Sequence, residues 1–137
     1  MKSVLILEDV SETLHWLGEI AVEAFPGCGV TGASSVRDAL AAMDRQVFDL
    51  ALIDLRLPDG SGLDVLRRLR AAFPDTICIV TTVMADDSSI VGALSAGASG
   101  YLLKEQMREG MIRQLQQIKE GVPALSPSIA RRIMEHF

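Results

Sequence analysis

The chain has 137 residues, 49% of them hydrophobic, which suits one domain with a sizeable buried core. Its formal net charge is −5 and its acidic and basic residues are interspersed, which argues against nucleic-acid binding by this chain alone, because neutralising phosphates requires a basic face. Two cysteines without a CxxC motif argue against a zinc site and a disulfide framework, and no apolar stretch approaches the length of a membrane span. We therefore expect a reduced, cytoplasmic protein that does not bind membranes.

Short apolar runs alternate with amphipathic stretches along the chain. The five expected strands cover residues 4–7, 30–33, 50–53, 77–80 and 101–103. Helices are expected from about Ser11, after a cap at Ser34 or Ser35, after the turn at 58–62, and around residues 90–97 and 111–118. Five consecutive βα units with continuous apolar strands predict an α/β fold, a doubly wound parallel sheet covered by helices on both faces.

The last segment has a different character. Residues 121–125 read as a connector, and Ser126-Pro127 as a helix start, with the serine as cap and the proline in the first turn. The stripe of apolar residues on this helix serves either packing or partner recognition, and the sequence leaves both open. Its members are Ile129, Ile133, Met134 and Phe137.

Acidic residues recur where strands end. Glu8 and Asp9 follow the first expected strand, and Asp54 ends the third. In the common strand order 2-1-3-4-5, strands one and three are neighbours, and ligands bind outside the carboxyl ends of such strands. Three converging carboxylates repel each other unless a cation joins them, and a site of few oxygen ligands suits Mg²⁺.

Two further strand ends add a hydroxyl and an ammonium group. Thr82 follows the fourth strand, and its hydroxyl can donate a hydrogen bond to a phosphoryl oxygen. Lys104 follows the fifth strand and can reach either a phosphoryl oxygen or the carboxylate of Asp54. A carboxylate nucleophile, a metal ion, a lysine and a hydroxyl donor together indicate formation of an acyl phosphate.

These residues, in this order and at these strand ends, resemble the receiver domains of two-component response regulators over roughly residues 2 to 120. The resemblance implies a five-stranded flavodoxin-like (CheY-like) fold. The matching segments are Glu8-Asp9, the stretch Asp54-Leu55-Arg56-Leu57-Pro58-Asp59-Gly60-Ser61-Gly62, Thr82, and Gly97-Ala98-Ser99-Gly100-Tyr101-Leu102-Leu103-Lys104.

The resemblance also implies roles for the acidic residues. Asp54 is the phosphoacceptor for a sensor histidine kinase. Mg²⁺ is held by Asp9, Asp54 and the main-chain oxygen of Arg56, while Glu8 acts mainly through metal-bound water. Such a domain assists its own phosphorylation and dephosphorylation but is not an enzyme in the ordinary sense.

The remaining implied roles concern the switch. Thr82 and Lys104 hold the phosphoryl group, and Tyr101 matches the switching aromatic residue of the family. Thr82 moves inward after phosphorylation and Tyr101 follows into the vacated space. The face formed by the fourth helix, fifth strand and fifth helix then changes, with homodimerisation as one possible outcome.

The C-terminal stretch Gly121-Val122-Pro123-Ala124-Leu125-Ser126-Pro127 resembles the linker of NarL/FixJ-type regulators, in which a LuxR-type helix-turn-helix domain follows. We therefore expect a receiver domain over residues 1–120. Residues 121–137 would be a linker and helix leading to an output domain that this chain lacks, through which a transcription regulator contacts DNA. The alternative is a stand-alone receiver.

Two other classes of protein fit less well. A phosphatase of the haloacid dehalogenase type also forms an aspartyl phosphate, but it needs a second aspartate where this chain has Arg56. A pseudo-receiver, an interaction module that is never phosphorylated, usually lacks one of the acids, the threonine or the lysine, and all are present here.

Overall fold

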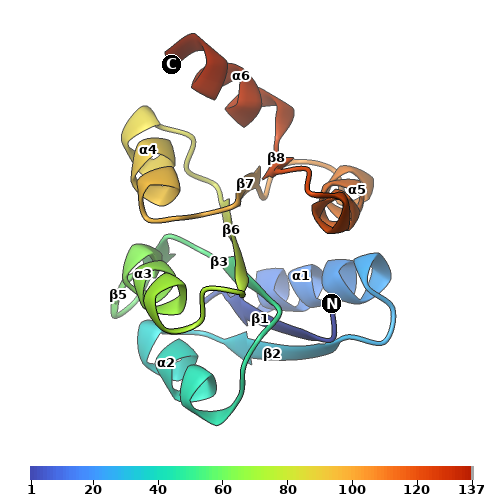
Figure 1. Cartoon of the computed structure of the whole chain (residues 1–137), viewed down its shortest axis with the longest axis vertical. Helices are drawn as coiled ribbons and strands as arrows, with labels where there is room; N and C mark the ends of the chain where they lie inside the picture. Colours follow the sequence, from blue (N-terminus) through green and yellow to red (C-terminus); the bar gives the residue numbers. More distant parts are fainter. Residues whose placement is uncertain (137) are drawn as a thin grey trace.

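Six parallel strands form the central sheet of this protein, whose computed structural model describes residues 1–136 (Figure 1). Along the sheet the strands follow the order β2-β1-β3-β6-β7-β8. The first five places confirm the predicted order 2-1-3-4-5, because β6 and β7 are the fourth and fifth expected strands. The strands are β1 (Ser3–Leu7), β2 (Gly29–Ala33), β3 (Leu50–Ile53), β6 (Ile77–Thr82), β7 (Gly100–Leu103) and β8 (Ala124–Leu125).

The prediction of five strands is wrong by one, because β8 pairs in parallel with β7 and extends the sheet. Two residues are too few to show as an apolar run in the sequence. The pairing also depends on Gly100, where a Cβ atom would lie 2.4 Å from the carbonyl oxygen of Ala124. The predicted connector over residues 121–125 thus includes a short strand.

Helices cover both faces of the sheet, as the continuous apolar strands predict (Figure 1). In β1, Leu5 and Leu7 enter one hydrophobic core, while Val4 and Ile6 enter the other. This burial on two sides explains why the strands show no polar alternation. One face carries α1 (Ser11–Ala24) and α5 (Arg108–Gln117), the other α2 (Val36–Arg45), α3 (Gly62–Ala72) and α4 (Asp87–Ser95), and a 3₁₀ turn, η1 (Ile118–Glu120), follows α5.

The helix α6 (Pro127–His136) begins where the sequence predicts. Of its apolar stripe, Ile129 is fully buried, Ile133 packs at the edge of the core, and Met134 is 81% exposed. Phe137 lies outside the described residues. Packing therefore accounts for the first part of the stripe. Within residues 1–136, no helix has the length and apolar character needed to cross a membrane.

The segment after β3 is a small hairpin rather than a simple turn. Its strands β4 (Arg56–Leu57) and β5 (Gly60–Ser61) pair antiparallel. The carboxylate of Asp59, at the tip, accepts hydrogen bonds from the amides of Val36 (2.8 Å) and Arg37 (3.0 Å). These bonds lower the pKa of Asp59 and tie the hairpin to the start of α2.

We predict that Gly62→Ala destabilises the fold strongly. A Cβ atom at Gly62 would lie 1.9 Å from the carbonyl oxygen of Asp54, so the backbone must shift, at a cost of about 3 kcal/mol or more. Gly110→Ala is the matched control, because its nearest contact would be the flexible side chain of Gln106 at 3.7 Å. At the third residue of α5, that change should stabilise by up to about 1 kcal/mol. Thermal unfolding of both variants measures the difference, and equal stabilities would contradict the predicted clash.

Candidate functional site

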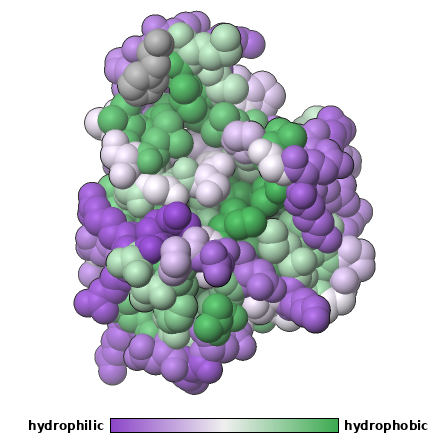
Figure 2. Space-filling view, in the orientation of Figure 1, coloured by the Kyte–Doolittle hydropathy of each residue, from purple (hydrophilic) through white to green (hydrophobic). Residues whose placement is uncertain are grey.

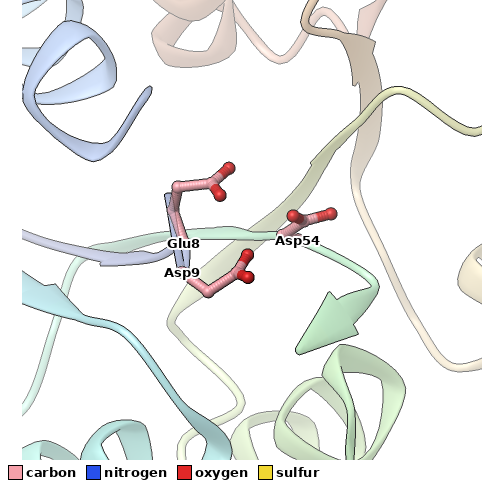
Figure 3. A group of neighbouring side chains, drawn as sticks. All are labelled: Glu8, Asp9 and Asp54. Carbon is pink, nitrogen blue, oxygen red and sulfur yellow. The ribbon is translucent and has the colours of Figure 1, made fainter. Parts of the chain in front are cut away.

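Three carboxylates meet where β1 and β3 end (Figure 3). The two strands pair in register up to Leu7 and Ile53, and the amide of Asp54 continues the ladder by donating to the carbonyl oxygen of Leu7 at 3.0 Å. One carboxylate oxygen from each of Glu8, Asp9 and Asp54 lies within 4.8 Å of the others. The predicted convergence of these three residues is therefore present in the structure.

Lys104 joins the same cluster from the end of β7. Its ammonium group donates to Oδ2 of Asp54 at 2.8 Å and also to Oε1 of Glu8. Neighbouring strands align its backbone, because the amide of Lys104 donates to the carbonyl oxygen of Thr82 at 3.0 Å. The side chains of Glu8 and Asp54 are almost fully buried, so these ion pairs are shielded from water.

Burial and pairing act in opposite directions on the charges. Burial raises the pKa of Glu8, while hydrogen bonds from Lys104 and the amide of Val10 oppose that rise. For Lys104, burial alone would lower the pKa, but hydrogen bonds to Asp54 and Glu8 outweigh it and raise the pKa. The lysine is therefore held in its charged form between two acids.

Hydrogen bonds from neighbouring groups fix the orientation of the carboxylate of Asp54. Its Oδ1 accepts a hydrogen bond from the amide of Leu55 at 2.8 Å, and its Oδ2 faces Lys104. Its backbone lies directly against Gly62 at the start of α3. Both carboxylate oxygens thus have a donor and a set direction.

The acidic residues fit a hard divalent cation. The three are oxygen donors only, which suits Mg²⁺, and Asp9 is exposed while Glu8 and Asp54 are buried. An ion held there would keep water molecules on its open side. Arg56 opens β4 two residues after Asp54, and the role of its main-chain oxygen stays a prediction.

Thr82 and Tyr101 belong to the neighbouring strands β6 and β7, and both are fully buried. The Oγ1 of Thr82 accepts a hydrogen bond from the amide of Met84 at 3.3 Å, and the hydroxyl of Tyr101 donates to the carbonyl oxygen of Met84 at 2.6 Å. Both side chains therefore contact the loop between β6 and α4. The sequence did not reveal this role of Met84, because a main-chain donor and acceptor leaves no signal in residue type.

Comparisons with known proteins agree with this geometry. Residues 4–116 match the family described as the response regulator receiver domain. The DNA-binding transcriptional activator DevR/DosR of Mycobacterium tuberculosis is 31% identical over 135 residues, which cover 98% of this chain and 62% of that protein. The chain thus spans less than two thirds of this relative.

Solved structures share the fold. A CheY-like receiver domain protein from Methanospirillum hungatei superposes with a TM-score of 0.76 and 30% identity, covering 88% of this chain and 93% of that one. A LuxR-family two-component response regulator from Aurantimonas sp. SI85-9A1 gives a TM-score of 0.84 at 24% identity, covering 98% and 96% of the two chains. The predicted CheY-like fold is confirmed. The chain belongs to the receiver domains of two-component response regulators, which are signalling modules rather than catalysts.

Proposed function

We propose that Asp54 accepts a phosphoryl group from a phosphohistidine of a sensor kinase, or from a small phosphodonor, and that this modification switches the domain. The observation that supports it is the convergence of a buried aspartate with a lysine and two further acids at one end of the sheet. A carboxylate with fixed oxygens and a neighbouring ammonium group is suited to nucleophilic attack on phosphorus.

The transfer forms one bond and breaks another. A carboxylate oxygen of Asp54 attacks the phosphorus while the bond between phosphorus and the donor nitrogen or oxygen breaks, and the donor keeps that electron pair. Lys104 lies 2.8 Å from Oδ2, so its ammonium group neutralises negative charge on the incoming phosphoryl oxygens. When bound, Mg²⁺ would supply further charge neutralisation, held by Asp9, Asp54 and the main-chain oxygen of Arg56, with Glu8 acting through water.

The proposed switch passes through the loop between β6 and α4. The hydroxyl of Thr82 turns toward the phosphoryl group, which breaks its hydrogen bond with the amide of Met84. Tyr101 is already buried, and its hydroxyl donates a hydrogen bond to the carbonyl oxygen of Met84. A movement of Met84 therefore changes the hydrogen bond that holds the tyrosine. The two arrangements form a bistable element that the new charge biases.

The wider role extends beyond the residues of this chain. The named relative is a DNA-binding transcriptional activator, and it is longer than this chain. We propose that the chain acts in the cytoplasm as the receiver of a transcription regulator over residues 1–120. Residues 121–137 would lead to a LuxR-type DNA-binding domain, and phosphorylation would promote homodimerisation.

Incubation with acetyl phosphate and Mg²⁺ should add one phosphoryl group to the protein, as intact mass spectrometry measures. The adduct should hydrolyse at alkaline pH, because acyl phosphates do, and Asp54→Ala should form none. Asp59→Ala is the matched control, because Asp59 caps α2 and faces away from the cluster of acids. An adduct on Asp54→Ala would contradict the assignment of the phosphoacceptor.

Asp9→Asn should weaken Mg²⁺ binding at least about tenfold, since it removes a negative oxygen ligand. Isothermal titration calorimetry measures the affinity, and chelation of the ion should stop adduct formation on the unchanged protein. Asp64→Asn, an exposed acid on α3, serves as the control of equal charge. Equal loss of affinity in both variants would mean that only net charge matters.

Tyr101 should titrate far above its ordinary pKa of about 10. Burial, and then the charges of Asp86 and Asp54, raise the pKa of Tyr101 to about 12. Because the folded state favours the neutral phenol, this stabilisation is complete below pH 10 or so and is lost as the pH rises toward 12. Ultraviolet absorbance follows the one tyrosine of the chain directly. A midpoint near the ordinary value in folded protein would place the side chain in solvent, and Tyr101→Phe should lack this part of the pH dependence.

A further inference from the structure

The C-terminal segment, residues 124–136, lies at the end of the molecule next to α4 and β7 (Figure 1). β8 pairs along the edge of β7, and α6 reaches α4 through the guanidinium of Arg132, which donates to Oδ1 of Asp87 at 2.8 Å. Residues of the same chain thus lie against α4 and β7, the elements that the proposed switch would change. The contacts of this segment with β7 decide how a change in the strand could reach α6.

Ser126 makes the closest of these contacts. Its side chain is buried, and its hydroxyl oxygen accepts a hydrogen bond from the amide of Leu103 at 2.8 Å. Its own amide donates to the carbonyl oxygen of Tyr101 at 3.1 Å. The chain turns into α6 at Pro127, so the hydroxyl takes the place that a main-chain carbonyl would have in a continued parallel ladder.

Ser126 also starts α6. Its carbonyl oxygen accepts hydrogen bonds from the amides of Ile129 (2.9 Å) and Ala130 (3.0 Å). One residue therefore connects the strand that carries Tyr101 and Lys104 to the first turn of the C-terminal helix. Any displacement of Leu103 acts directly on the point where α6 begins.

The end of β7 is held from two sides. Ser126 binds the amide of Leu103, and the carbonyl oxygen of Thr82 binds the amide of Lys104. The side chain of Lys104 then extends to Asp54. Loss of the bond on the Ser126 side leaves a partly buried amide without its acceptor and frees the backbone from which the lysine reaches the site.

The helix α6 is docked lightly enough to respond. Ile129 is its one fully buried residue in the described part. The ion pairs of Arg132 and His136 with Asp87 are about half exposed to solvent, where such pairs contribute little. An apolar groove of about 540 Å³ remains beside Ile133, and Figure 2 shows hydrophobic residues gathered below the helix. A small change at its first turn can therefore shift the docking equilibrium.

We propose that Ser126 is a positioning residue for Lys104 and couples the phosphorylation site to α6. Its hydroxyl holds the end of β7 where Lys104 meets Asp54, and movement of that strand end on phosphorylation changes the docking of α6 on α4. This proposal rests on the proposed phosphorylation of Asp54. Residues 124–136 would then be an intramolecular partner whose docking depends on the phosphorylation state of the domain.

The test compares the full chain with Ser126→Ala, which removes the acceptor, and Ser126→Thr, which keeps it. Adduct formation with acetyl phosphate should be about tenfold slower in the alanine variant, because Lys104 is less well placed. The threonine variant should recover the rate. Both variants should still bind Mg²⁺, since the ligands come from other strands, whereas a general loss of structure would abolish Mg²⁺ binding and phosphorylation together.

Amide hydrogen exchange gives the second readout. In the unchanged protein, exchange in residues 127–136 should differ before and after phosphorylation, and this difference should disappear in Ser126→Ala. Arg132→Gln is the control: it should raise exchange of α6 in both states while phosphorylation proceeds at the normal rate.

Each failure has a distinct meaning. No adduct on the unchanged protein, with acetyl phosphate and with a phosphorylated sensor kinase as donors, overturns the proposed function and this proposal with it. A normal adduct with identical exchange of α6 in both states overturns only the coupling. A normal phosphorylation rate in Ser126→Ala overturns the positioning role. If that variant does not fold, the exchange comparison on the unchanged protein still decides the coupling.

Discussion

A single ammonium group, that of Lys104, balances two acids that the fold buries together. Burial raises the pKa of Glu8 and on its own would lower that of Lys104, so it disfavours both charges. Hydrogen bonds between the two side chains oppose this effect of burial, and Asp54 gains a fixed partner on Oδ2. One lysine against three carboxylates still leaves an excess of negative charge. The proposed phosphoryl group would increase that excess, so a divalent cation would stabilise the site together with the lysine.

The topology of the sheet makes this cluster possible. Asp54 and Lys104 are fifty residues apart in the chain, yet both follow strands whose carboxyl ends meet at one edge. Parallel pairing fixes the register of these ends, and the close contact of Gly62 with Asp54 lets α3 start directly beside the proposed phosphoacceptor. The hairpin that follows is tied to α2 through Asp59. The carboxylate of Asp54 thus lies on rigid elements, which limit its movement to the geometry that the proposed phosphoryl transfer would need.

Most of this arrangement could be predicted from the sequence, because the patterns that indicate it lie within single strands and helices. Continuous apolar runs mark the buried parallel strands, and the acids, the threonine and the lysine stand where those runs end. Ser35 was one of two candidate caps, and its side chain accepts the hydrogen bond from the amide of Asp38. Such features depend on residue type and spacing within one element, so they can be read without a structure.

Other features depend on contacts between distant segments and left no such signal. β8 consists of two residues whose pairing is allowed by a glycine on the neighbouring strand. The inward position of Tyr101 is set by a main-chain oxygen of Met84. Ser126 reads as an ordinary helix cap, and only the structure shows that its hydroxyl serves β7 instead. In each case the partner is a backbone group, and the sequence gives no information about which backbone groups meet.

The short strand β8 also limits how a partner can read the domain. A free strand edge invites pairing with another chain, but here β8 takes the edge of β7. The outer edge of β8 offers little for a further strand to pair with. The strand has only two residues and follows Pro123, and the carbonyl oxygen of Leu125 already accepts a hydrogen bond from Nε2 of Gln114 at 3.0 Å. Strand addition is therefore a poor route for recognition at this end of the sheet. The helix α6 begins at Ser126, which is bonded to β7, and it keeps Met134 exposed. In the proposed coupling, a partner would therefore contact this helix rather than a strand edge.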